Sequence, residues 1–131
     1  MTSSKLVLML GAAAVALPAW AQPLSKGLVR PLPTVSGNDI SLAIGQVSVE
    51  VDGKVSRAIG INGTVPGPLI RLKEGQRVRL RVQNTLDEDS SIHWHGLLLP
   101  FQYDGVPGVS FPGIKSGETF VYDIPALRQS G

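Results

Sequence analysis

QRVRLRVQN, residues 76–84 of this 131-residue chain, decides the fold class because apolar and polar residues alternate along it. Successive side chains of a β-strand point to opposite faces, so Val78, Leu80 and Val82 share one face and the three arginines share the other. The pattern predicts a strand with one buried and one exposed face. The arginine face fits either a solvated sheet surface or a stripe that binds phosphate groups.

Turn signals divide the rest of the chain into further short strands. Asp52-Gly53, Asn62-Gly63 and Glu74-Gly75 are typical of tight turns. The hydrophobic phase shifts near Gly45, which predicts a bulge or a break in the strand there. Short strands at this spacing predict an all-β sandwich. The predicted strands are residues 40–51, 55–61, 69–72, 76–84, 92–99 and 118–124, with a long loop rich in glycine and proline over residues 100–117.

The composition narrows the classes of function. With 17% charged residues, 15 glycines and 10 prolines, the chain is typical of one β-rich domain. The net charge of only +2 and the lack of aromatic residues between the arginines argue against a nucleic-acid partner. Cysteine is absent, which excludes disulfides, zinc–cysteine sites and thiol chemistry.

The first 21 residues predict a signal peptide. An apolar run over residues 6–17 precedes Ala19-Trp20-Ala21, which fits a small-x-small cleavage site and places the mature start at Gln22. Without a twin arginine, the Sec route to the periplasm is the simpler interpretation, and an uncleaved anchor is the alternative. We expect no membrane attachment after cleavage, an extended leader over residues 22–38, and one domain over residues 39–131.

The only two histidines of the chain, His93 and His95, are separated by one residue. On a strand they would point to the same face, about 7 Å apart, while Trp94 would point into the core. Neutral imidazole is a preferred ligand of copper and zinc. Two ligands make an open site, and an H-x-H pair also occurs without any metal. The pair alone therefore leaves the matter undecided.

The segments around this pair carry a resemblance to a known family. In order and spacing they resemble the N-terminal cupredoxin domain of multicopper oxidases, and most closely the bacterial copper resistance protein A group. The resemblance implies a cupredoxin-like Greek-key β-sandwich with copper as cofactor. The segments that carry it are N62-G-T-V-P-G-P68, E74-G75, S91-I-H-W-H-G96, L99-P-F-Q102, D104-G-V-P-G108, F111-P-G-I114 and R128-Q-S-G131.

The resemblance also implies roles for single residues. His93 matches a ligand of the type 2 copper and His95 a ligand of the type 3 copper pair. Asp104 matches an acidic residue that assists proton delivery during oxygen reduction, although a plain turn residue before Gly105 is an equal alternative. We expect Tyr103 to pack rather than to take part in redox chemistry.

The chain also departs from the family pattern. It carries the first of four copper motifs and ends where the second would begin, and it has no cysteine for a type 1 copper. We therefore expect a truncated member that is inactive alone. A full-length member would oxidise a substrate such as cuprous ion and reduce oxygen to water. The partners of this chain would be copper ions, the missing C-terminal domains or other copper-handling proteins. We also expect the sandwich to lack its closing strand, which would lie beyond Gly131. The alternatives are a small periplasmic copper-binding module without redox turnover, and a non-functional fragment from a frameshift or an incomplete gene.

Overall fold

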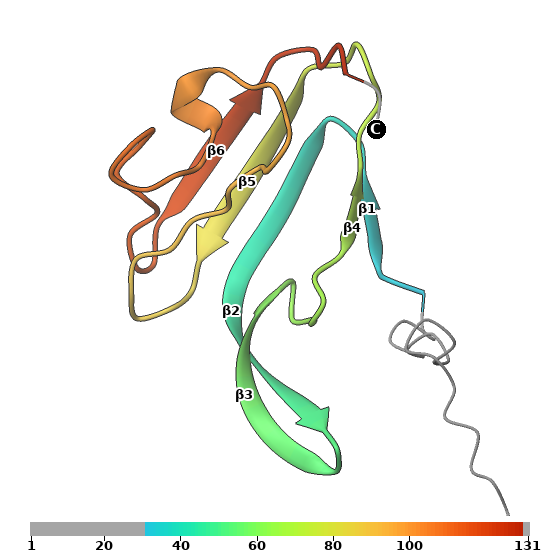
Figure 1. The fold of residues 1–131 in the computed structure, drawn as a ribbon, viewed down its shortest axis with the longest axis vertical. Helices are drawn as coiled ribbons and strands as arrows, with labels where there is room; N and C mark the ends of the chain where they lie inside the picture. The colour runs from blue at the N-terminus through green and yellow to red at the C-terminus, as the bar shows by residue number, and fades with distance from the viewer. Residues whose placement is uncertain (1–30, 130–131) are drawn as a thin grey trace, which may run out of the picture. The chain divides into compact units, whose positions relative to one another are not determined.

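A computed structural model describes residues 31–129, and these are organised almost entirely as strands and loops (Figure 1). Four strands form one sheet in the order β3-β2-β5-β6, and two form a small sheet, β1-β4. The bounds are β1 Thr34–Ser36, β2 Asp39–Val51, β3 Lys54–Ile61, β4 Leu69–Arg71, β5 Val78–Asn84 and β6 Thr119–Ile124. The alternating segment that predicts the fold class is the interior strand β5, so that prediction is confirmed.

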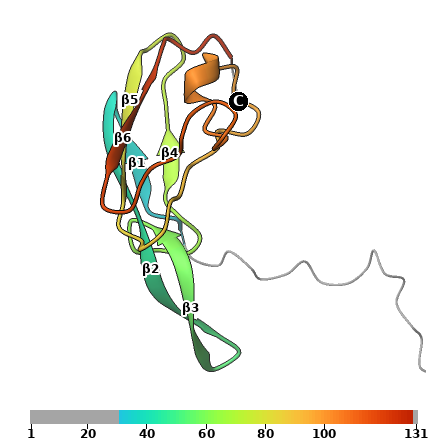
Figure 2. The same cartoon turned by 90° about the vertical axis from the view of Figure 1, so that its left-hand side faces the viewer.

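The long strand β2 has different partners in its two halves. Its first half pairs in parallel with β5, from Asp39 opposite Arg79 to Ile44 opposite Asn84. Its second half pairs with β3 in a hairpin that extends beyond the rest of the sheet (Figures 1 and 2). The strand continues through Gly45, so the predicted bulge or break is wrong. The shift in hydrophobic phase instead marks the point where β2 leaves the core and continues as a two-stranded hairpin.

The first strand lies where we expected an extended leader. β1 pairs in parallel with β4, and Val35 and Ile70 are register partners that both pack against the core. Part of this segment is thus a strand that the sequence did not predict, because three residues are too short to show a period of two. The predicted signal peptide lies outside the described residues. Within residues 31–129, no helix is long and apolar enough to cross a membrane.

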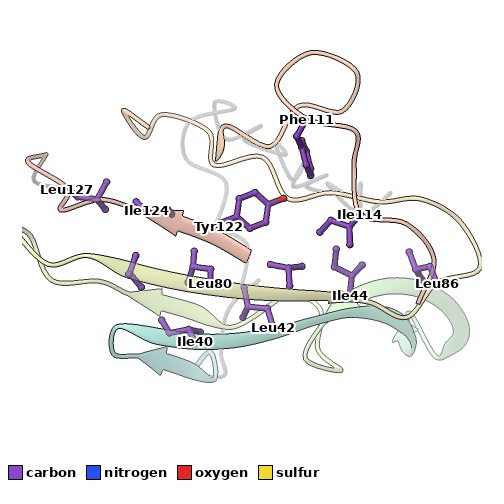
Figure 3. Packing of buried hydrophobic residues seen from close by; sticks show 12 residues of the cluster. Ile40, Leu42, Ile44, Leu80, Leu86, Phe111, Ile114, Tyr122, Ile124 and Leu127 are labelled. Carbon is purple, nitrogen blue, oxygen red and sulfur yellow. The ribbon is translucent and has the colours of Figure 1, made fainter. Parts of the chain in front are cut away.

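One face of the larger sheet carries the core. Leu80, Val82, Tyr122 and Ile124 are completely buried on β5 and β6, as the alternation of these strands predicts. The loop between β5 and β6 covers this face, and Figure 3 shows Phe111 lying over Tyr122. The Phe111 and Tyr122 ring centroids are 6.0 Å apart. The long loop is thus part of the core, and it brings its own residues close to the strands.

The opposite face of the sheet carries the arginines. Arg79 and Arg81 both bind the Asp39 carboxylate, with the closest atoms 2.6 and 3.0 Å apart, and Arg77 binds Asp123. The hydrogen bond from Arg81 lowers the pKa of Asp39, which keeps that carboxylate ionised. Because each of the three arginines pairs with a neighbouring carboxylate, a solvated, ion-paired sheet face explains them better than a phosphate-binding stripe does.

The core assignment predicts the cost of truncating Leu80. Leu80→Ala should lower the free energy of unfolding by about 2–5 kcal/mol, because the side chain is completely buried and leaves a cavity. Val55→Ala is the matched control on an edge strand, where the side chain is 73% exposed, and it should change stability by less than about 0.5 kcal/mol. Urea denaturation measures both. Equal losses in the two variants would contradict the assigned core.

Candidate metal site

The segment that carries both histidines is extended, but it is not a strand. The Trp94 N–H donates to the Asp104 carbonyl at 3.3 Å, and the Leu97 N–H donates to the Trp94 carbonyl at 3.1 Å. The second bond closes a β-turn in which Gly96 has a φ of +84°. The predicted strand over residues 92–99 is therefore wrong, because the turn ends the extended segment and its neighbour is a loop rather than a strand.

The predicted arrangement of side chains nevertheless holds. The imidazoles of His93 and His95 are both exposed, with ring centroids 5.5 Å apart and planes at 81°. Trp94 points the other way and meets the buried Tyr122 ring edge to face at 5.3 Å. Alternation needs only an extended backbone, so it survives without a regular strand on either side. The structure thus brings the two predicted ligands together on one surface.

The main-chain carbonyl of Asp104 fixes the tautomer of His93. It lies 2.8 Å from His93 Nδ1, whereas the Asp104 carboxylate oxygen Oδ2 lies at 3.5 Å. Because a carbonyl oxygen only accepts hydrogen bonds, Nδ1 carries the proton in the neutral imidazole, and Nε2 then carries the lone pair. Metal-binding histidines almost always have their second ring nitrogen held in this way. His93 is therefore oriented as a ligand that offers Nε2.

The contact between His93 and the Asp104 carbonyl requires the backbone at Gly105 to lie very close to the backbone at Ile92. A Cβ placed on Gly105 would lie 1.9 Å from the Ile92 carbonyl oxygen, and Gly105 has a φ of +85°. On the other side of the same peptide segment, the Ile92 N–H donates to the Tyr122 hydroxyl at 3.3 Å. Burial raises the pKa of Tyr122, so that hydroxyl keeps its proton. The residue before His93 is thus held between the loop and the core.

The remaining candidates lie close to this segment. Asp104 follows a short 3-10 turn over Phe101–Tyr103, and its side chain is partly exposed beside His93. Tyr103 packs against the core, which agrees with the packing role expected for it. Sequence reasoning did not single out Tyr122 as a supporting residue. The alternation of β6 indicates that Tyr122 is buried, but not that its hydroxyl meets the histidine segment.

The donor set fits part of a copper site. Two neutral imidazoles suit copper, and one of them is fixed as the tautomer that leaves Nε2 free. Among residues 31–129 there is no group of three or more histidine, cysteine, aspartate or glutamate side chains that could hold a metal ion. Copper and zinc sites usually take three or four protein ligands. This part of the chain therefore offers two adjacent imidazoles, fewer donors than such a site usually takes.

Comparison with known proteins identifies the family. A family model described as multicopper oxidase matches residues 43–131. The chain belongs to the multicopper oxidase family. It is 46% identical over 114 residues to copper resistance protein A of Pseudomonas syringae pv. tomato, and 41% identical over 125 residues to copper resistance protein A of Escherichia coli. The crystal structure of a multi-copper oxidase from Pseudomonas thermotolerans matches with a TM-score of 0.65 and 40% identity.

These matches cover the chain far better than they cover the relatives. The two copper resistance proteins match 87% and 95% of this chain, but only 18% and 20% of their own lengths. The solved oxidase matches 71% of this chain and 23% of its own. The chain thus spans about a fifth of the curated relatives. The expected cupredoxin-like β-sandwich is confirmed, and copper is the cofactor of the family.

The close approach at Gly105 predicts a large effect of one added methyl group. Gly105→Ala should destabilise the domain by about 1–3 kcal/mol beyond the cost of positive φ, because the Cβ would overlap the Ile92 carbonyl. Gly108→Ala is the matched control, since Gly108 has a φ of +73° and no atom within 4 Å of the added Cβ. It should cost only the conformational term, about 1–2 kcal/mol. Equal losses of stability in urea would contradict the close approach.

Proposed function

We propose that this chain supplies His93 and His95 as ligands to a multinuclear copper centre of an oxidase related to copper resistance proteins. The observation that carries the proposal is the hydrogen bond between His93 Nδ1 and the Asp104 carbonyl, which leaves Nε2 free beside a second exposed imidazole. Membership of a copper-binding family supports copper over other metals that imidazole accepts.

The two histidines would serve different metal positions. By its place in the motif, His93 would bind the type 2 copper and His95 one copper of the type 3 pair. When bound, copper would supply the electron transfer that reduces oxygen to water, with a substrate such as cuprous ion as the electron source.

Asp104 would have two roles at this site. Its carbonyl accepts a hydrogen bond from His93 Nδ1 and so orients that ring. Its carboxylate is 38% exposed and lies beside the ring, so it has access to solvent protons and would deliver them to the reduction of oxygen. The partial exposure supports the second role, because a proton donor must be recharged from solvent after each transfer.

The remaining copper ligands would come from outside residues 31–129. The described part of the chain offers two imidazoles and no larger group of potential ligands. The curated relatives extend over about five times the length that this chain matches. We therefore infer that the described domain alone does not catalyse oxygen reduction. We also propose that export by the signal peptide predicted over residues 1–21 would place the site in the periplasm.

Copper titration of the full chain tests the ligand assignment. His93→Ala, His95→Ala and the double variant should each bind Cu(II) on the order of tenfold or more weakly than the unsubstituted chain. Gln46→Ala is the control, since Gln46 is exposed in the β2–β3 hairpin. Equal affinity in the double variant would refute the assignment. Tight binding with four protein ligands by the unsubstituted chain would favour the alternative of a self-contained copper-binding module.

A further inference from the structure

The turn that contains His95 is held by a side chain from the far end of the domain. Gln129 Nε2 donates to the Gly96 carbonyl at 2.7 Å, and the Leu98 N–H donates to Gln129 Oε1 at 2.9 Å. The single carboxamide therefore satisfies an acceptor and a donor on the two residues that flank Leu97. This is the hydrogen-bond pattern by which a neighbouring strand would hold an extended backbone.

This contact matters because the two histidines are secured differently. The His93 ring has its own hydrogen bond to the Asp104 carbonyl. Within residues 31–129, the His95 ring has no hydrogen bond or ion pair to protein. The backbone of the turn from Trp94 to Leu97 therefore sets where the His95 side chain projects, and its ring meets the His93 ring edge to face at 5.5 Å. A turn anchored only at its start would let the His95 ring move relative to the His93 ring.

We propose that Gln129 is a positioning residue for His95, holding the exit of the turn so that the two imidazoles keep their relative orientation. The inference rests on the proposed function, since it takes His95 to be a metal ligand. Three observations carry it: the two hydrogen bonds of the carboxamide, the turn closed by Leu97, and the absence of a partner for the His95 ring in the described part of the chain.

Gln129 could instead serve only to pack the domain, and the test variants must distinguish that role from the positioning of His95. Gln129 also lines an open, largely apolar cavity of about 330 Å³ together with Trp94, Leu97 and Leu127. Gln129→Met keeps a side chain of similar length in that cavity and removes both hydrogen bonds. Gln129→Glu keeps the acceptor for the Leu98 N–H but loses the donor to the Gly96 carbonyl. Gln46→Glu is the matched control for the added charge, on an exposed residue of the hairpin.

The first measurement needs no metal. Because the chain has only two histidines, a ¹H–¹³C spectrum of the full chain shows two sets of ring signals, which His93→Ala and His95→Ala assign. In Gln129→Met and Gln129→Glu, the His95 ring signals should shift or broaden clearly more than the His93 ring signals, which sense the His95 ring 5.5 Å away. Unchanged His95 signals would overturn the inference. Equal movement of both rings would also overturn it, since it would indicate a general loosening of the domain.

The second measurement is Cu(II) titration of the same variants. Gln129→Met should bind on the order of tenfold more weakly than the unsubstituted chain, and Gln46→Glu should bind equally well. If the Gln129 variants match Gln46→Glu while the His95→Ala variant loses affinity, the positioning role is refuted and the proposed function stands. If His93→Ala and His95→Ala also bind normally, the proposed function fails, and the metal-free spectrum alone decides whether Gln129 orients His95.

Discussion

The main-chain carbonyl of Asp104 is the contact on which the site depends. It accepts one hydrogen bond from the Trp94 N–H and one from His93 Nδ1. The first joins the long loop to the histidine segment, although neither is a strand. The second selects the tautomer that leaves Nε2 free for a metal. One oxygen atom thus couples the path of the backbone to the chemistry of the imidazole.

The core beneath the site keeps this contact in place. Trp94 packs on the buried ring of Tyr122, whose hydroxyl binds the Ile92 N–H, and Gly105 lets the loop approach the Ile92 carbonyl. The two histidines therefore project from a backbone that is fixed from below by aromatic packing and from the side by the loop. The backbone that carries the pair would therefore lose little freedom when a metal binds, which favours affinity.

The sequence predicts the strands better than the site. Residues 76–84 alternate clearly enough to locate β5 and its buried face, and the family motifs point to both histidines. The H-x-H spacing correctly predicts neighbouring rings with Trp94 in the core, but wrongly predicts a strand, because extended backbone alone has the same alternation. The contact of Asp104 with His93 and that of Gln129 with the Gly96 turn join residues 11 and 33 positions apart, and no local pattern encodes them.

The tautomer of His93 is the most direct test of this account. In a ¹⁵N-labelled full chain at a pH where both imidazoles are neutral, the long-range ¹H–¹⁵N spectrum distinguishes a protonated ring nitrogen from a bare one. The account predicts that His93 carries its proton on Nδ1, hydrogen-bonded to the Asp104 carbonyl, and leaves Nε2 bare. A His93 ring protonated on Nε2, or one that exchanges freely between the two tautomers, would contradict it.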